Sequence, residues 1–176
     1  MAYTYTGEFN NYVPFEAGSA HFDSIIAHIQ RVQDIGARIG VQPNLLKSHD
    51  ASKFSMFEFP IYAKHFFGGG DEHFVVALNH HYRANPHHWN HWVLHHNFPR
   101  SLCEAGFEHG IVSHMALEMP HPYADEMLAD WMALSLEKTG DVDITEWLNA
   151  NKDNMQLHEL TRDYVFSHAK ELGIYA

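Results

Sequence analysis

Apolar residues recur at steps of three and four along much of the chain, which is the period of an amphipathic helix. The longest such run lies between Ser19, a candidate N-cap, and Gly40, which ends the pattern. Its apolar members are Phe22, Ile25, Ile26, Ile29, Val32, Ile35 and Ile39. The pattern therefore predicts a long helix, preceded by an irregular arm over residues 1–18.

Proline positions divide the next stretch into two shorter helices. Pro43 suits the first turn of a helix that runs to His49, because its ring fixes the backbone angle φ at a helical value. Its missing N–H would have no hydrogen-bond partner within the helix at that position. Ser55 is a candidate N-cap for a third helix over residues 56–67. Since Pro60 lies inside that range, we expect this helix to be interrupted or kinked.

The remaining pattern is mostly helical. A fourth helix begins near Phe74 and stops before Pro86. Further helices are predicted over residues 122–138, 143–151 and 158–172. The segments WVL and IVSHMALEM predict a small hairpin at about residues 92–118. The expected fold class is therefore all-α with one small β-hairpin, in a single domain over residues 19–176.

Composition narrows the class of protein. The chain has 176 residues, of which 45% are hydrophobic, so it is long enough to bury a substantial core. Its 11 basic and 22 acidic residues give a formal net charge of −11, which argues against an extended nucleic-acid-binding surface. A small anionic substrate is still compatible with this charge, provided that a metal or a few cations are focused in a cleft.

Three features favour a cytoplasmic protein. Cys103 is the single cysteine, so no internal disulfide can form. The start, MAYTYTGEFNNY, lacks the basic and apolar regions of a signal peptide. No apolar run approaches membrane-spanning length, so we expect no membrane partner. An oligomer is compatible with the sequence.

Histidine is the outlier, at 17 residues. Neutral imidazole is the commonest metal ligand, so a metal site is the first explanation to test. Four pieces stand out: His28 inside the first helix, the pair His49-Asp50 in KSHDASKF, the segment NHHYRANPHHW, and Asp130 in EMLADW. Each lies on or beside a helix with an apolar stripe. Packing those stripes together would bury carboxylates and imidazoles that need partners, and a metal supplies them.

The order of these residues resembles that of the HD-domain superfamily of metal-dependent phosphohydrolases. The resemblance covers about residues 20–140 and implies an HD-domain-like helical bundle. It also implies one metal ion, held by His28, His49, Asp50 and Asp130. More narrowly, HDASKFSMFEF and NPHHWNHW resemble an uncharacterised family of bacterial and phage proteins with HDxSKF and NPHHWxxW motifs.

Further matches concern a binuclear branch, the cyclic-dinucleotide phosphodiesterases. There a Lys follows the Asp by three residues, as Lys53 follows Asp50, and a later His-His-x-Arg resembles HHYR, which begins at His80. An adjacent His pair precedes the last Asp, as the pair ending at His88 does here. The resemblance implies a second ion held by His80 and His88, with Asp50 bridging. The Gly-Tyr-Pro of that branch is absent, which argues against cyclic-dinucleotide specificity.

The implied chemistry is hydrolysis of a phosphate ester, with a nucleotide or a related small molecule as substrate. Mixed nitrogen and oxygen ligation suits one or two divalent ions of iron, manganese, cobalt, nickel or zinc. Such an ion binds a phosphoryl oxygen and lowers the pKa of a water, while Lys53 and Arg83 neutralise phosphate charge. Glu126 lies one turn before Asp130 on the same helix face and is a candidate general acid or base.

Several residues also have simpler interpretations. His81, His87 and Trp89 are candidate substrate contacts, but the HHW segment equally suits a packing motif at a helix start, and tryptophans are mostly core residues. The two cations can be ordinary salt-bridge partners. Glu126 can serve only to hydrogen-bond a ligand histidine.

Two other functions fit the same residues. A di-iron oxygenase would use a ligand order of this kind to activate O₂. A non-catalytic helical protein would use the site as a structural metal centre. The irregular stretch at residues 96–120 is a candidate lid, and NKDNMQLHELTR predicts a helix break and restart.

Overall fold

The computed structural model describes residues 12–95 and 114–176. This part of the chain is mostly helical and contains a two-stranded antiparallel sheet, which confirms the all-α class with a small hairpin. Within these ranges, no helix combines the length and the apolar character that a membrane crossing needs.

The chain consists of two compact units. Unit 1 comprises Met1–Ala27 and Asp50–His81, and unit 2 comprises His28–His49 and Tyr82–Ala176. Two of the boundaries between them fall inside helices, α1 (Phe15–Ile39) and α4 (Phe74–Ala84), and the third lies between His49 and Asp50. The single-domain boundary at residues 19–176 stays a prediction.

Unit 1 contains the first half of α1, most of α4, a short 3₁₀ helix η1 (Ala51–Phe54) and α3 (Phe59–Phe67). Pro60 lies in the first turn of α3, where its missing N–H is not needed. The helix starts at Phe59, with this proline as its second residue, so the predicted start at residue 56 and the predicted kink are wrong. The core of the unit is small: Ile61, Tyr62 and Ala77, with Phe74 packed against them.

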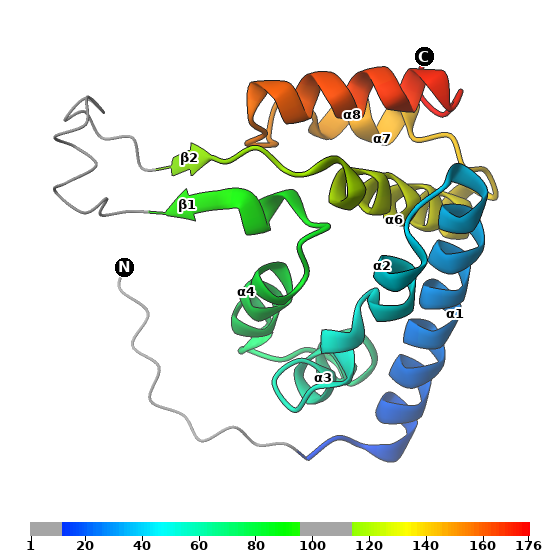
Figure 1. The fold of residues 1–176 in the computed structure, drawn as a ribbon. Helices are drawn as coiled ribbons and strands as arrows, with labels where there is room; N and C mark the ends of the chain where they lie inside the picture. The colour runs from blue at the N-terminus through cyan, green and yellow to red at the C-terminus, as the bar shows by residue number, and fades with distance from the viewer. Residues whose placement is uncertain (1–11, 96–113) are drawn as a thin grey trace, which may run out of the picture. The chain divides into compact units, whose positions relative to one another are not determined.

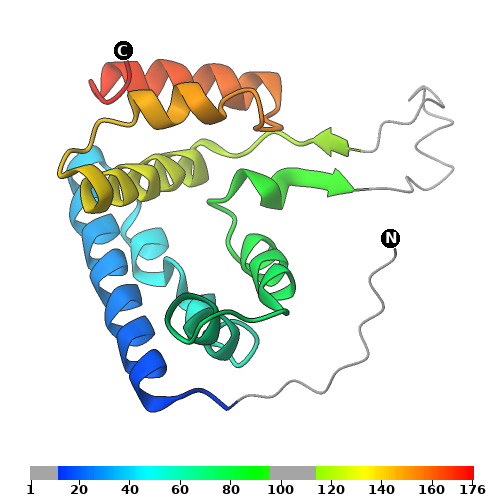
Figure 2. The ribbon, with the colours of Figure 1, turned by 180° about the vertical axis from the view of Figure 1, so that it is seen from behind.

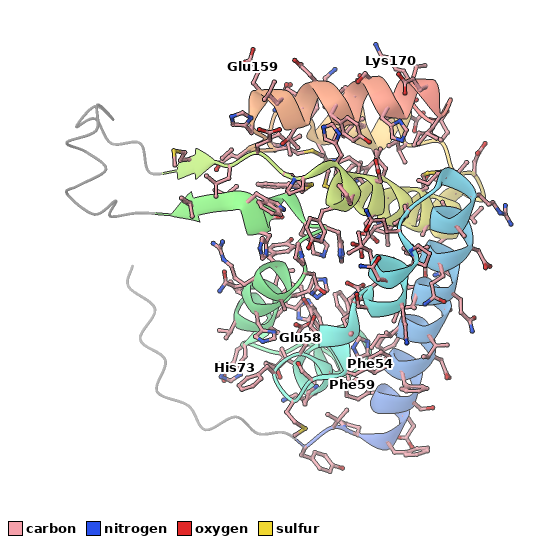
Figure 3. The ribbon with its side chains drawn as sticks, viewed as in Figure 1. Phe54, Glu58, Phe59, His73, Glu159 and Lys170 are labelled. Carbon is pink, nitrogen blue, oxygen red and sulfur yellow. The ribbon has the colours of Figure 1, made fainter. Side chains whose placement is uncertain are left out.

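Unit 2 holds the larger core. Its further elements are α2 (Pro43–Ser48), η2 (Trp89–Trp92), β1 (Val93–His95), β2 (His114–Ala116), α6 (His121–Thr139), α7 (Thr145–Asn151) and α8 (Glu159–Glu171). Figures 1 and 2 show α7 and α8 beside α6, and α6 packs directly against α8. Glu159 and Lys170 lie on the outer face of α8, away from α6 (Figure 3). The gap between α7 and α8 confirms the predicted helix break and restart.

Helix α6 is buried around most of its circumference. Its fully buried apolar residues include Met127, Leu128 and Ala133. Glu126 and Asp130 lie on the same helix and are only 3% and 5% exposed. Since carboxylates are rarely buried without partners, these two side chains mark the position in unit 2 where chemistry is to be expected.

A glycine lets α1 and α2 approach each other closely. A Cβ added at Gly36 would lie 2.5 Å from Cδ2 of Leu46. Next to this contact, Nε2 of Gln33 donates a hydrogen bond to the carbonyl of Leu46 at 3.1 Å. These contacts hold the short α2 against α1 just before His49, which is the C-cap residue of α2.

The N-terminal boundary of α1 differs from the prediction. The helix begins at Phe15, four residues before Ser19, so residues 15–18 are helical and do not belong to an irregular arm. Gly18 accordingly donates its N–H to the carbonyl of Pro14 at 2.9 Å, as in a first helical turn. Residues 1–11 of the predicted arm lie outside the described part of the chain.

The hairpin forms where the sequence predicted it. Leu94 of β1 pairs with Met115 of β2 in an antiparallel register. The N–H of Leu117 then donates to the carbonyl of Trp92 at 2.8 Å, which extends the pairing toward α6. Most of the candidate lid at 96–120 lies outside the described residues.

Candidate metal centre

Three buried side chains of unit 2 bring their ligand atoms together. Nε2 of His28, from α1, lies 3.1 Å from Oδ1 of Asp130, from α6. Nε2 of His49, after α2, lies 3.4 Å from Nε2 of His28 and 4.0 Å from Oδ1 of Asp130. Metal bonds of about 2.1 Å put neighbouring ligand atoms roughly 3.0–3.5 Å apart. Two of the three separations lie in this range and the third is 4.0 Å, so these residues could hold a metal ion, and we call this set the unit 2 donor triangle.

The carboxylate of Asp130 carries its charge in the protein interior. Burial raises its pKa, but the hydrogen bond from His28 and the charges of His49, His28 and His87 outweigh burial and hold the pKa below its usual range. An ionised carboxylate that is 5% exposed needs a cationic partner. Protonated imidazole or a metal ion can supply that partner.

Glu126 orients His49 from the opposite side of the ring. Its Oε1 lies 2.9 Å from Nδ1 of His49 and 3.3 Å from Nδ1 of His87. Burial raises the pKa of Glu126, but the hydrogen bonds from these two histidines more than offset burial and lower it. An ionised carboxylate only accepts, so Nδ1 of His49 donates, and in the neutral ring Nε2 then offers a lone pair.

This arrangement favours the simpler interpretation of Glu126. Carboxylates that accept from the non-ligating nitrogen of a histidine are the usual outer partners of metal sites. A lowered pKa suits an acceptor better than a general acid. His49, His87 and Glu126 also form a buried group whose ligand atoms lie within 4.8 Å of one another and could hold a metal ion.

The NPHHW segment packs beside this cluster within unit 2. The ring of His87 is 2% exposed and lies 4.3 Å, centroid to centroid, from that of His49. His88 is half-buried, with its ring 4.2 Å from His87 and 5.2 Å from Tyr82. Trp89 packs against the core of unit 2, which favours a structural role for it over a substrate contact.

Asp50, the first residue of the second segment of unit 1, has an uncommon backbone conformation. Its φ is +55°, and it is the only non-glycine residue with positive φ in the described chain. Such a left-handed conformation costs most side chains energy but is tolerated by Asp and Asn. The carboxylate is 1% exposed, and Nζ of Lys53 lies 2.6 Å from its Oδ2. Unusual backbone angles cluster at functional sites.

A second glutamate, Glu58, organises histidines in unit 1. It is fully buried at the start of α3 (Figure 3) and accepts from Nδ1 of His80 at 2.6 Å and from Nδ1 of His81 at 2.9 Å. Burial raises its pKa, but hydrogen bonds from His81, Ser52 and His80, together with the charge of His81, lower it overall. Glu58 thus acts on its histidine pair as Glu126 does on His49 and His87.

Of the HHYR pair, His81 faces Asp50. Its Nε2 lies 3.3 Å from Oδ1 of Asp50, and its side chain is 5% exposed. His80 is instead 41% exposed at its side chain, with its ring stacked on Phe57 at 5.5 Å. Within unit 1, His81 is therefore better placed than the predicted His80 to share a ligand site with Asp50.

Arg83 is engaged with backbone groups of unit 2. Its Nη1 donates to the carbonyls of Val93 at 3.2 Å, His91 at 3.4 Å and Asn90 at 3.5 Å. These bonds hold η2 and the start of β1 beside the end of α4. The contact supports a structural role, and phosphate neutralisation by Arg83 stays a prediction.

Sequence reasoning named most of the residues that the fold gathers. Unit 2 brings together His28, His49, His87, Glu126 and Asp130, and unit 1 brings together Asp50, Lys53, His80 and His81. Glu58 is the residue it missed, although this residue lies in the HDASKFSMFEF motif eight positions after Asp50. The described clusters of buried His, Asp and Glu could hold a metal ion.

Comparison with known proteins gives one family. The profile of a family of unknown function, DUF5662, matches residues 18–171. No curated protein and no solved structure matches the chain. The matched range contains every candidate ligand from His28 to Asp130 and covers most of the chain. The chain therefore belongs to the DUF5662 family.

Proposed function

We propose that the chain is a metal-dependent phosphohydrolase that acts on a nucleotide or a related small phosphate ester. The observation that carries the proposal is the unit 2 donor triangle of His28, His49 and Asp130, whose ligand atoms lie 3.1 to 4.0 Å apart on buried side chains. The HD-like order of these residues along the chain is the second support, because that ligand order is typical of phosphohydrolases.

The donor set indicates the class of metal. Two imidazole nitrogens and one carboxylate oxygen suit divalent iron, manganese, cobalt, nickel or zinc, whereas calcium prefers oxygen ligands alone. When bound, such an ion supplies a Lewis acid for a phosphoryl oxygen and lowers the pKa of a water. Three protein ligands are also typical of catalytic metal sites, while structural zinc sites use four.

The surrounding side chains have defined tasks in this proposal. Glu126 keeps the proton on Nδ1 of His49, so that Nε2 is available to the ion. Asp50 follows His49 directly in the chain but belongs to unit 1, and its role as a further ligand stays a prediction. Lys53 is ion-paired with Asp50 within unit 1, and its role in neutralising phosphate charge likewise stays a prediction.

A second ion would use the ligand atoms of unit 1. Asp50 and His81 offer Oδ1 and Nε2 at 3.3 Å, and Glu58 holds the other nitrogen of His81. We therefore assign His81 to this role in place of His80. His88 stays a predicted ligand of the second ion.

Metal analysis combined with a substrate screen tests the proposal. Untagged protein, purified without chelator, is analysed for each transition metal per chain, and phosphate release is then measured over nucleoside mono-, di- and triphosphates and p-nitrophenyl phosphate. We expect one or two ions per chain and hydrolysis that ends on chelation and returns with metal. The variant Asp130→Asn should lose both metal and hydrolysis.

The matched control is Asp125→Asn, on the same helix. Asp125 accepts a hydrogen bond from the hydroxyl of Tyr164 at 2.6 Å, so its substitution tests helix α6 without touching the donor triangle. Metal binding without hydrolysis of any phosphate ester would overturn the proposal. Two irons per chain with consumption of O₂ would establish the oxygenase alternative instead.

A further inference from the structure

Unit 2 contains a second candidate site, a cleft of about 720 Å³ at the C-terminal end of α6. The end of α6, the loop before α7 and the start of α7 form its walls. Its lining does not include the histidines, Glu126 or Asp130 of the candidate metal centre. Its volume is in the range of about 300–1,000 Å³ that small-molecule sites occupy.

Two tryptophans form an aromatic corner of the cleft. The rings of Trp131 and Trp147 lie 4.9 Å apart, centroid to centroid, at an interplanar angle of 52°. Trp131 is 7% exposed and anchored in the core, whereas Trp147 is 40% exposed. The faces of tryptophan rings carry partial negative charge and attract cations better than those of other aromatic residues.

The rim of the cleft is acidic. Asp141, Asp143 and Glu146 line it, against a single cation, Lys138. Hydrogen bonds from the side chain and the backbone N–H of Thr145 lower the pKa of Asp143, so this carboxylate is ionised at neutral pH. The charge of the rim is therefore complementary to a positively charged ligand.

The cleft is held in shape by hydrogen bonds of its own loop. Oγ of Ser135 donates to the carbonyl of Asp143 at 2.6 Å, and the N–H of Thr145 donates to Oδ1 of Asp143 at 2.7 Å. The N–H of Ile144 donates to the carbonyl of Ile174 at 2.9 Å, which ties the loop to the C-terminal segment. Because this loop is already ordered, less conformational entropy is lost when a ligand binds.

We propose that this cleft binds a small organic cation of the ammonium class. The aromatic corner offers cation–π contact with the ammonium methyl or methylene groups, and the rim carboxylates neutralise the charge. A hydrated alkali ion would gain little from the tryptophans, and a neutral apolar molecule would gain nothing from the carboxylates. The combination selects a ligand that is both cationic and apolar.

Titration with tetramethylammonium chloride tests this proposal. Tryptophan fluorescence is followed at constant ionic strength, with sodium chloride and the neutral isostere tert-butanol as comparison ligands. We expect a saturable change in the millimolar range for tetramethylammonium alone. Affinity should fall about tenfold in Trp147→Leu and several-fold in Glu146→Gln, since each removes one part of the recognition.

Glu159→Gln provides the matched control, because this exposed carboxylate lies on the outer face of α8 (Figure 3). Its affinity for tetramethylammonium should equal that of the unaltered chain. Circular dichroism establishes that each variant is folded. Equal binding of tert-butanol, unchanged binding in Trp147→Leu, or the absence of any saturable change would overturn the proposal.

Discussion

His49 and Glu126 are 77 positions apart in the sequence, yet Nδ1 of His49 lies 2.9 Å from Oε1 of Glu126. The contact joins the end of α2 to the first half of α6 inside unit 2. It decides which nitrogen of His49 carries the proton and therefore which one faces His28 and Asp130. The ring of His49 is thus oriented by a protein contact that requires no ion.

The first prediction concerns Glu126→Gln. The amide keeps the size of the side chain but loses the charge that fixes the His49 proton, so metal affinity should fall about 10- to 100-fold. Competition against a chromophoric chelator measures the change. Glu118→Gln, an exposed carboxylate just before α6, should bind metal as the unaltered chain does.

A different outcome would assign Glu126 to proton transfer. If Glu126→Gln retained full metal affinity and lost only turnover, the residue would act as general acid or base, as the first sequence hypothesis has it. A loss of affinity with proportionate loss of turnover supports the orienting role.

The second prediction concerns Asp130→Asn and its neighbour Asp125→Asn. The first replaces the charged carboxylate by a neutral amide and so removes the buried negative charge that favours a cation, so bound metal per chain should fall toward zero. The second alters the contacts of Asp125 with Tyr164 and with His168, both outside the donor triangle, and should leave the metal content unchanged. Elemental analysis after gel filtration measures both, and equal metal content in the two variants would contradict the donor triangle.

The third prediction concerns the stability role of Glu58. Glu58→Ala removes the carboxylate that accepts from Nδ1 of His81 and from Nδ1 of His80, so the free energy of unfolding should fall by about 1–3 kcal/mol. Urea unfolding measures the change. The exposed Glu72→Ala is the control and should change stability by less than about 0.5 kcal/mol. Similar losses in both variants would remove the special role of Glu58.

The fourth prediction concerns His21, which lies among the rings of Phe59, Tyr62 and Phe67 in unit 1. Burial, aided by the charge of Lys53, lowers its pKa from 6.5 to about 4. Between pH 4 and pH 6.5, His21 is therefore protonated in the unfolded chain and neutral in the folded chain. Because only the unfolded chain gains this proton, the free energy of unfolding is highest above pH 6.5. It decreases by up to about 3 kcal/mol as the pH falls toward 4.

Urea unfolding at several pH values tests this linkage. His21→Phe keeps an aromatic ring and removes the titrating group, so the difference in unfolding free energy between the two proteins should grow as the pH falls from 6.5 to 4. Other titrating groups contribute equally to both proteins and cancel in the difference. A constant difference over this range would show that His21 is not the acid-sensitive group.

The sequence predicted the long helices because their period is repeated over many residues. α1 and α6 were predicted in this way, and the hairpin was predicted from two strand-forming segments. The predicted start of α3 was wrong because Ser55 was interpreted as its N-cap, and the predicted kink was wrong because Pro60 was interpreted as a helix breaker, although proline also suits a first turn. The 3₁₀ helix η1 was not predicted, since four residues carry no periodic signal.

The candidate site shows a similar division. His28, His49 and Asp130 were predicted as ligands because their order along the chain resembles that of the HD-domain superfamily, and the fold of unit 2 brings their side chains together. Glu58 was missed because a lone glutamate beside apolar residues has no pattern, and its role arises only through hydrogen bonds to His80 and His81 across the fold of unit 1. The difference in burial between those two histidines likewise depends on the side of α4 that each one occupies.

The left-handed backbone at Asp50 changes how this position should be probed. Alanine there would remove the carboxylate and also the short polar side chain that makes a left-handed backbone tolerable, at a cost of roughly 1–2 kcal/mol, so lost binding and lost folding would be confounded. Asparagine tolerates the same φ and keeps the size of the side chain, while a neutral amide replaces the charged carboxylate. Asp50→Asn is therefore the substitution that isolates the electrostatic contribution of the carboxylate, whereas alanine scanning would overstate it.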